Sequence, residues 1–231
     1  MFNDRWKLPR AGFGSSRGAV FSPPAIDAAG RSSNSGGNVY SRHSHGLEQF
    51  FNHIEDRSGL QLLDFSGVSQ ANVGFITSLG CKLYSDDLIQ SLDLAFGGGD
   101  IYENQSQPER IDTFLNQNLN FPENHFDGVL LWDVPGFLAP PLLKAAVDRL
   151  RRMVRPGSYL MAMFHAEDRA SQVPVYSYRI SDAKTLLLSP RGSRKPAQFF
   201  NNRAVENLFQ GFESVKFFLT RDSLREVIVK R

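Results

Sequence analysis

The sequence is short of several features that mark common classes of protein. Its single cysteine, Cys81, excludes an intrachain disulfide, a cysteine-based zinc site and a CxxC redox pair. Neither sign of charge dominates, since 26 Lys and Arg face 24 Asp and Glu, so nucleic acid and anionic membrane are unsupported as partners. Residues 1–10 carry charges without the apolar stretch expected of a secretory signal, and no segment approaches the roughly 18 uninterrupted apolar residues of a membrane span. These absences favour a cytoplasmic protein with no membrane role.

Residues 11–37 are poor in large apolar side chains and rich in Gly, Ser, Ala and Pro. Such a segment cannot bury enough surface to offset the entropy lost on ordering. We therefore predict a flexible N-terminal tail over residues 1–40 and one domain over residues 41–231. An arm that orders over a bound substrate is the alternative for the tail.

From Ser44 onward, apolar residues at helical spacing alternate with short apolar runs. Ser44 suits the cap of a first helix, Gly80 the end of a second, and Pro140-Pro141 the first turn of another. The run FDGVLLWDV is nearly continuous in apolar residues, as in a strand buried on both faces. Helices are expected over residues 45–57, 70–79, 88–96 and 142–154, and strands over 60–65, 81–85, 113–119, 126–134 and 158–166.

Beyond residue 166 the pattern changes to strands over 175–180, 184–189, 214–220 and 224–230, with one short helix over 203–210. Alternating strands and helices predict parallel βαβ units, whereas the C-terminal strands should pair antiparallel at an edge. The predicted fold class is α/β, with three layers and a mostly parallel central sheet. The strand over 113–119 conflicts with this scheme, because too few residues separate it from the next strand for a parallel crossover.

Four segments resemble, in order, motifs of the class I S-adenosylmethionine-dependent methyltransferases. They are LLDF with its following turn and helix, GCKLYSDDL, LNFPENHFDGVLLWDV and LRRMVRPGSYLMAMF, and GFESVKFF resembles the final edge hairpin of that family. The resemblance implies a Rossmann-like methyltransferase fold with S-adenosylmethionine as cofactor. It also implies methyl transfer to a small or medium-sized acceptor molecule, whose identity the sequence does not give.

The resemblance places the cofactor at the turn after the first strand, with Asp64, Ser66 and Gly67 among its contacts. Ligands of open parallel sheets bind beyond the carboxyl ends of the strands, where this turn lies. Asp87 matches the acidic residue that holds the ribose hydroxyls, and Asp86 is a close rival. Capping of the next helix is an equally good explanation of either aspartate.

Asn118 lies where the family carries a polar residue near the adenine. It is predicted to hydrogen-bond the base, with capping of a loop as the alternative.

The turn LLDFSGVSQANVG departs from the family pattern, because Ser66, Val68 and Gln70 occupy the three glycine places. Glycine permits a positive φ, which a β-branched valine resists. Either Gly67 supplies the flexibility along a different path, or cofactor affinity is reduced or lost. A catalytically inactive methyltransferase-like protein that acts in binding is therefore the alternative function. A nicotinamide dehydrogenase is disfavoured, because no GxGxxG follows the first strand.

Residues at the ends of the fourth and fifth strands are candidates for the acceptor side. Asp133 and His165 are placed to act as a general base, although structural roles explain each of them as well. Trp132 and Phe137 can line an aromatic pocket or belong to the core. The segment WDVPGF lacks the Asn/Asp-Pro-Pro-aromatic tetrad of amino methyltransferases, which disfavours amino methylation of DNA.

Overall fold

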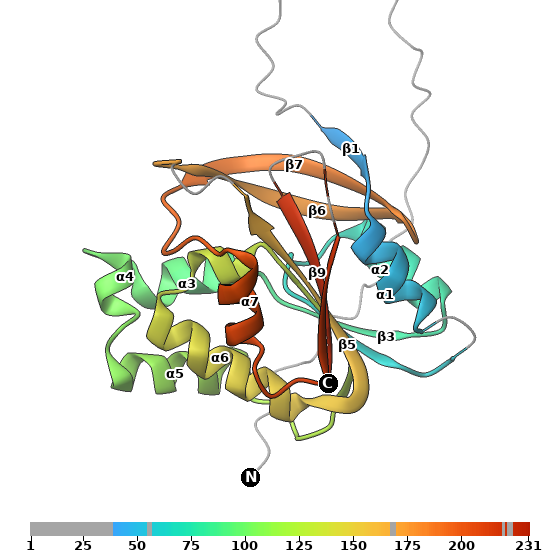
Figure 1. Ribbon diagram of the computed structural model, residues 1–231, viewed down its shortest axis with the longest axis horizontal. Helices are drawn as coiled ribbons and strands as arrows, with labels where there is room; N and C mark the ends of the chain where they lie inside the picture. The colour runs from blue at the N-terminus through green and yellow to red at the C-terminus, as the bar shows by residue number, and fades with distance from the viewer. Residues whose placement is uncertain (1–38, 55–56, 167–169, 219, 221–223) are drawn as a thin grey trace, which may run out of the picture. The chain divides into compact units, whose positions relative to one another are not determined.

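The computed structural model of the chain describes residues 39–54, 57–166, 170–218, 220 and 224–231 (Figure 1). The predicted tail falls on residues 1–38, outside the described residues, apart from its last two positions, and it stays a prediction. Tyr40 already belongs to a strand. Within the described residues, no helix is long and apolar enough to cross a membrane.

A six-stranded sheet forms the centre of the domain. Four of its strands are parallel, and β9 pairs antiparallel with both β5 and β8, so the C-terminal strands form an antiparallel hairpin at one edge. The strand order is β3-β2-β4-β5-β9-β8. The strands are β2 (Gln61–Asp64), β3 (Lys82–Ser85), β4 (Phe126–Trp132), β5 (Val154–His165), β8 (Ser214–Phe218) and β9 (Leu224–Lys230).

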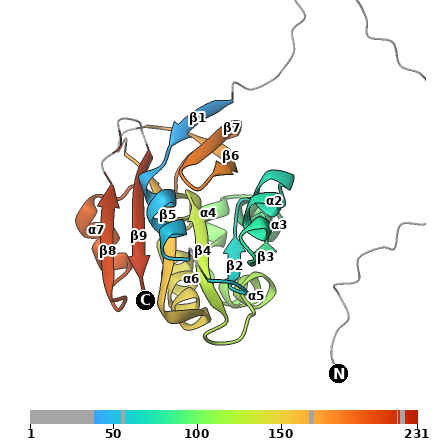
Figure 2. The ribbon, with the colours of Figure 1, turned by 90° about the vertical axis from the view of Figure 1, so that its right-hand side faces the viewer.

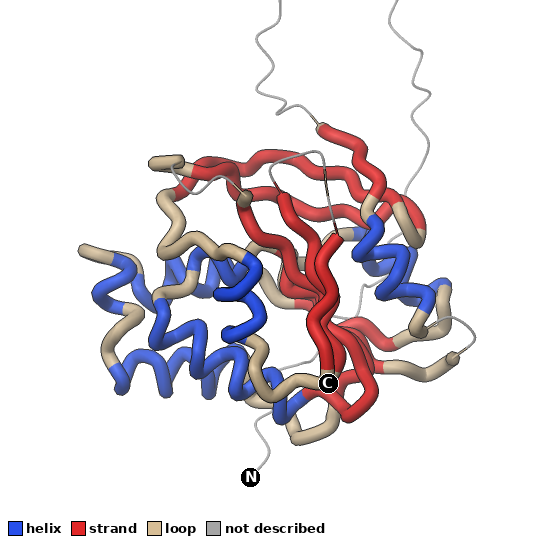
Figure 3. Tube along the Cα trace, in the orientation of Figure 1, coloured by secondary structure: helices blue, strands red, loops and turns tan. Residues whose placement is uncertain are grey.

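Helices cover both faces of this sheet, as Figure 3 shows in blue against the red strands. On one face lie α1 (His45–Asn52) and α2 (Gln70–Ser78). The other face carries α3 (Leu88–Phe96), α4 (Ile101–Asn104), α5 (Pro108–Asn118), α6 (Pro140–Met153), α7 (Asn202–Leu208) and the 3₁₀ helix η1 (Val134–Phe137). The arrangement confirms the predicted fold class, a Rossmann-like methyltransferase fold of three layers.

Local sequence explains how α1 docks on the sheet. Ser44 caps the helix as predicted, its Oγ accepting a hydrogen bond from Leu47 N at 3.1 Å. Phe50 points from α1 onto β4 at Gly128, where a Cβ atom would lie only 2.6 Å from the ring and 2.9 Å from Leu62. The missing side chain of Gly128 therefore allows the helix to pack closely against the middle of the sheet.

The strand predicted over residues 113–119 is wrong, because this segment belongs to α5. Pro108 opens the helix at its first position, and Ile111, Phe114 and Leu115 are buried at helical spacing. All of the regular elements between β3 and β4 are therefore helices.

A second sheet has the order β1-β7-β6 and is antiparallel. It joins the N-terminal strand β1 (Tyr40–His43) to the hairpin of β6 (Val173–Asp182) and β7 (Thr185–Arg194). The sequence led us to expect β6 and β7 at the edge of the main sheet, and this expectation is wrong. Figures 1 and 2 show the hairpin across the carboxyl ends of the central strands.

Candidate functional site at the carboxyl ends of the strands

The order of the parallel strands creates a topological switch point beside β2. The chain runs from β2 to β3 on one side and then to β4 on the other, so the connections diverge at the carboxyl end of β2. Open α/β sheets bind ligands at such switch points. Asp64 ends β2 there, and Trp132 ends the neighbouring β4.

In the turn after β2, Gly67 supplies the flexibility, which is the first of the two alternatives expected from the sequence. Gly67 has φ +85°, and its amide donates to Asp86 O at 3.0 Å. Ser66 forms an isolated β-bridge with Asp87. Val68 is 81% exposed and does not have a positive φ. The turn thus needs glycine at position 67 alone, and it lies directly against the acidic end of β3.

Asp64 is fully buried, and groups of its own chain hold its carboxylate. It accepts hydrogen bonds from Ser66 N at 2.9 Å, Asn72 Nδ2 at 2.7 Å and Trp132 Nε1 at 2.6 Å. Burial raises the pKa of Asp64, and the three donors act in the opposite direction. This carboxylate ties the turn, α2 and β4 together.

Asn72 extends the same network to the second sheet, and we did not single it out from the sequence. Its Nδ2 donates to Tyr178 O at 3.1 Å, and its Oδ1 accepts from Ile180 N at 2.8 Å. The available signal was a polar residue four positions before the buried Ile76, on the inner face of α2. Asn72 therefore ties β6 of the second sheet to α2.

Asp87 caps the next helix, as one of its two predicted roles requires, and its binding of the ribose stays a prediction. It caps α3 by accepting from Gln90 N at 3.1 Å. Arg191 of β7 also holds it with both guanidinium nitrogens, Nη2 lying 2.9 Å from Oδ1. Partial burial alone would raise the pKa of Asp87, but the hydrogen bonds from Arg191 and Gln90 outweigh it and lower the pKa. Burial raises the pKa of the neighbouring Asp86.

Asn118 is not brought together with the other predicted cofactor residues. It ends α5, and its side chain donates to Phe114 O at 2.8 Å. Because β4 starts a few residues later, this helix end lies near the amino edge of the sheet, whereas Asp64 and Asp87 lie at the carboxyl edge. The side chain of Asn118 thus binds the last turn of its own helix, and its role at the adenine stays a prediction.

Trp132 has a strained backbone at the end of β4. Its φ is +53°, a value that bulky side chains rarely adopt. The indole is almost fully buried and stacks on Tyr178 with ring centroids 4.6 Å apart. Strain of this kind persists only where surrounding contacts hold it, and it gathers at functional sites.

Three polar side chains beside Trp132 form what we call the buried polar cluster: Asp133, His165 and Tyr178. Asp133 Oδ2 lies 3.6 Å from His165 Nε2, and all three residues are buried. These two atoms and Tyr178 Oη have no hydrogen-bond partner among the described residues. Burial raises the pKa of Tyr178 well above its usual value, and the charge of Asp133 and its polar contact with the phenol act in the same direction. The ring of Phe137 lies 6.1 Å from that of His165.

The strand order, with its switch point beside β2 and the acidic end of β3, defines an α/β protein of the methyltransferase fold. No family model matches the sequence, and no curated protein matches it.

Similar solved structures include a 1,6-didemethyltoxoflavin-N1-methyltransferase of Burkholderia thailandensis, with 11% identity, TM-score 0.43 and coverage of 80% of this chain and 76% of that one. A SAM-dependent methyltransferase of Methanosarcina mazei has 13% identity, TM-score 0.45 and coverage of 78% and 96%. One from Archaeoglobus fulgidus has 10% identity, TM-score 0.45 and coverage of 80% and 91%. Because these TM-scores are below 0.5, the fold assignment rests on the strand order of this chain.

Proposed function

We propose that this chain is an S-adenosylmethionine-dependent methyltransferase acting on a small or medium-sized acceptor in the cytoplasm. The observation that carries the proposal is the buried polar cluster at the carboxyl ends of β4 and β5. Buried polar groups of folded proteins nearly always have partners, and within the described residues three buried polar atoms of this cluster face only one another, which favours a site that a ligand completes. The cluster lies at the switch point of the sheet, where this fold places ligands.

The acidic residues at the carboxyl ends of β2 and β3 fit the cofactor only in part. Asp87 is 20% exposed at its side chain and, with Asp86, offers carboxylates to the ribose hydroxyls, whereas Asp64 is fully committed to its own chain. When bound, S-adenosylmethionine supplies an electrophilic methyl group. His165 accepts the proton of the acceptor, and the carboxylate of Asp133 stabilises the imidazolium that results.

Arg191 stands in the way of ribose binding, because it occupies both oxygens of Asp87. We therefore propose that the cofactor competes with Arg191 for this carboxylate. Ion pairs near the protein surface are worth about 0–1 kcal/mol, and this partly buried pair more, so the competition weakens binding of the cofactor.

A thermal-shift titration with S-adenosylmethionine and S-adenosylhomocysteine tests the proposal. A ligand at 100 times its dissociation constant adds about 2.7 kcal/mol to stability. We expect a rise in melting temperature for the natural chain, a larger rise for Arg191→Gln at equal ligand concentration, and a smaller one for Asp87→Ala. Arg194→Gln is the matched control, because Arg194 joins β7 to Asp93 of α3 in the same way without touching Asp87.

The absence of any shift at millimolar ligand in both the natural chain and Arg191→Gln would contradict the proposal. An equal gain from Arg194→Gln would show that loosening of β7, and not release of Asp87, controls the affinity.

A second function is favoured by the contacts of Asp64 and Asp87. Both carboxylates that the resemblance assigns to the cofactor are held by protein groups, as in a fold retained for binding alone. This alternative, a catalytically inactive methyltransferase-like protein, predicts no ligand-dependent shift in any of the variants. The same titration therefore separates the two functions.

A further inference from the structure

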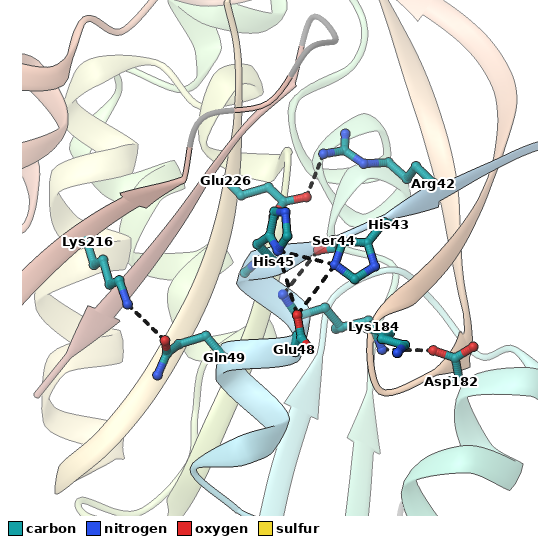
Figure 4. A network of polar contacts seen from close by, with 12 residues as sticks. Arg42, His43, Ser44, His45, Glu48, Gln49, Asp182, Lys184, Lys216 and Glu226 are labelled. Carbon is teal, nitrogen blue, oxygen red and sulfur yellow. Dashed lines mark hydrogen bonds and ion pairs between the residues drawn. The ribbon is translucent and has the colours of Figure 1, made fainter.

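Three side chains with metal-binding atoms converge where β1 passes into α1, within the sequence HSHGLE. His43 ends β1, and His45 and Glu48 lie in the first turn of α1. His43 Nε2 is 3.2 Å from His45 Nδ1, and Glu48 Oε2 is 3.4 Å from the first atom and 3.6 Å from the second. Figure 4 shows the two imidazoles and the carboxylate turned toward one another.

These separations match the edges of a tetrahedral metal site. Zn²⁺ binds nitrogen and carboxylate oxygen at about 2.0–2.2 Å, so two ligands of a regular tetrahedron lie about 3.3–3.6 Å apart. All three measured distances fall in or within 0.1 Å of this range. We propose that His43, His45 and Glu48 form a Zn²⁺ site with its fourth position open.

Hydrogen bonding explains one of the three contacts, the 3.2 Å hydrogen bond between His43 Nε2 and His45 Nδ1, but not the other two. The two contacts of Glu48, at 3.4 and 3.6 Å, are longer than the 2.7–3.2 Å of ordinary N–H···O hydrogen bonds. A cation shared by three ligands requires such spacings, because each ligand then points to the ion and not to its neighbours. Two imidazoles and one carboxylate are also ordinary donors for Zn²⁺.

The backbone between the ligands is held firmly, although the ligands themselves are largely exposed. Ser44 is fully buried and donates its amide to Lys184 O at 2.8 Å. Gly46 donates its amide to the buried carboxylate of Glu226 at 2.7 Å, and a Cβ atom there would lie 3.1 Å from that group. Arg42 pairs with Glu226 at 2.5 Å. These contacts fix the backbone that carries the two imidazoles with respect to α1.

A surface hollow adjoins the site. It has a volume of about 270 Å³ and is lined by His45, Glu48, Gln49, Asn52 and Phe218, so two of the three ligands belong to its wall. Zinc sites with three protein ligands keep one position for water or substrate. The hollow gives a water molecule or a small anionic ligand access to that position.

Titration of the full chain, produced without a polyhistidine tag, with Zn²⁺ in a calorimeter tests the proposal. We expect one equivalent to bind. Co²⁺ in place of Zn²⁺ should give the intense visible absorption of a tetrahedral ion. Even the loss of a group that only hydrogen-bonds a metal ligand lowers the affinity for the metal by about 10–100-fold. We therefore expect His43→Ala, His45→Ala and Glu48→Gln each to weaken binding by more than about 100-fold.

His53→Ala is the control, because His53 follows the same helix but hydrogen-bonds Gln49 and stacks on Tyr159. It should bind Zn²⁺ like the natural chain. The three ligand side chains are partly exposed, so their variants should fold, which circular dichroism checks. Absence of binding, binding unchanged in the three ligand variants, or an equal loss in His53→Ala would each overturn the proposal.

Discussion

The two sides of the switch point differ in how their polar groups are satisfied. On the side of β2 and β3, Asp64 and Asp87 have hydrogen-bond donors from three or more elements of the chain. On the side of β4 and β5, three polar atoms of the buried polar cluster have no hydrogen-bond partner among the residues that the structure describes. The first side is built for stability, whereas the second carries unsatisfied groups, which proteins tolerate where a ligand binds.

The largest effect is expected from removing Asp64. Asp64→Ala leaves the donors of Trp132 and Ser66 without an acceptor in the core and removes one of the acceptors of Asn72, so we expect the free energy of unfolding to fall by about 3 kcal/mol. Urea denaturation measures this. Asp133→Asn is the paired test from the other side. It should leave the free energy of unfolding within about 1 kcal/mol or raise it, because an amide can donate to His165. Equal losses in both variants would remove the contrast between the two sides.

A smaller loss is expected at the turn. Gly67→Ala places a Cβ atom at φ +85° and 3.2 Å from Asp87 Cβ, so it should cost about 1–2 kcal/mol of unfolding free energy. Val68→Ala, one position along, changes an exposed side chain and should stay within about 0.5 kcal/mol. If both variants were equally harmful, the positive φ would not be what makes glycine necessary here.

The smallest effect is expected in the dependence of stability on pH. Arg191 helps to lower the pKa of Asp87 from its ordinary 3.8, so the pair contributes stability above that pH and loses it as the pH falls through the lowered pKa. The stability gap between the natural chain and Arg191→Gln should therefore be greatest above about pH 4 and shrink below it. Thermal unfolding at low salt across this range measures the gap. In an Asp87→Asn background, Arg191→Gln should add no further dependence on pH.

The local parts of this structure were predictable from the sequence. The bounds of α3 were predicted to the residue, and those of α2 and β4 within two, because capping residues, glycine stops and apolar spacing act over short distances. The strand expected over 113–119 failed against a helical signal that was present, Pro108 followed by Ile111, Phe114 and Leu115. We gave the regular alternation of strands and helices more weight there than the helical spacing of the apolar residues.

The site depended on contacts that no local pattern contains. Arg191 lies 104 positions from Asp87, and Asn72 lies 108 positions from Ile180. The sequence located Asp133 and His165 at the ends of their strands, but not their approach to Tyr178 in β6. Positions along one strand could be predicted, whereas the second sheet that closes over them could not.

The second sheet also sets an order of assembly during synthesis. β1 is made early, yet its partner β7 follows far along the chain, since Tyr40 pairs with Leu188. At about 5–20 residues per second, a ribosome needs roughly 7–30 s to make the intervening 148 residues. Until then β1 has an unpaired edge, and the backbone bond from Ser44 to Lys184 does not exist. Completion of the nascent chain up to β7 therefore controls when its first strand is protected.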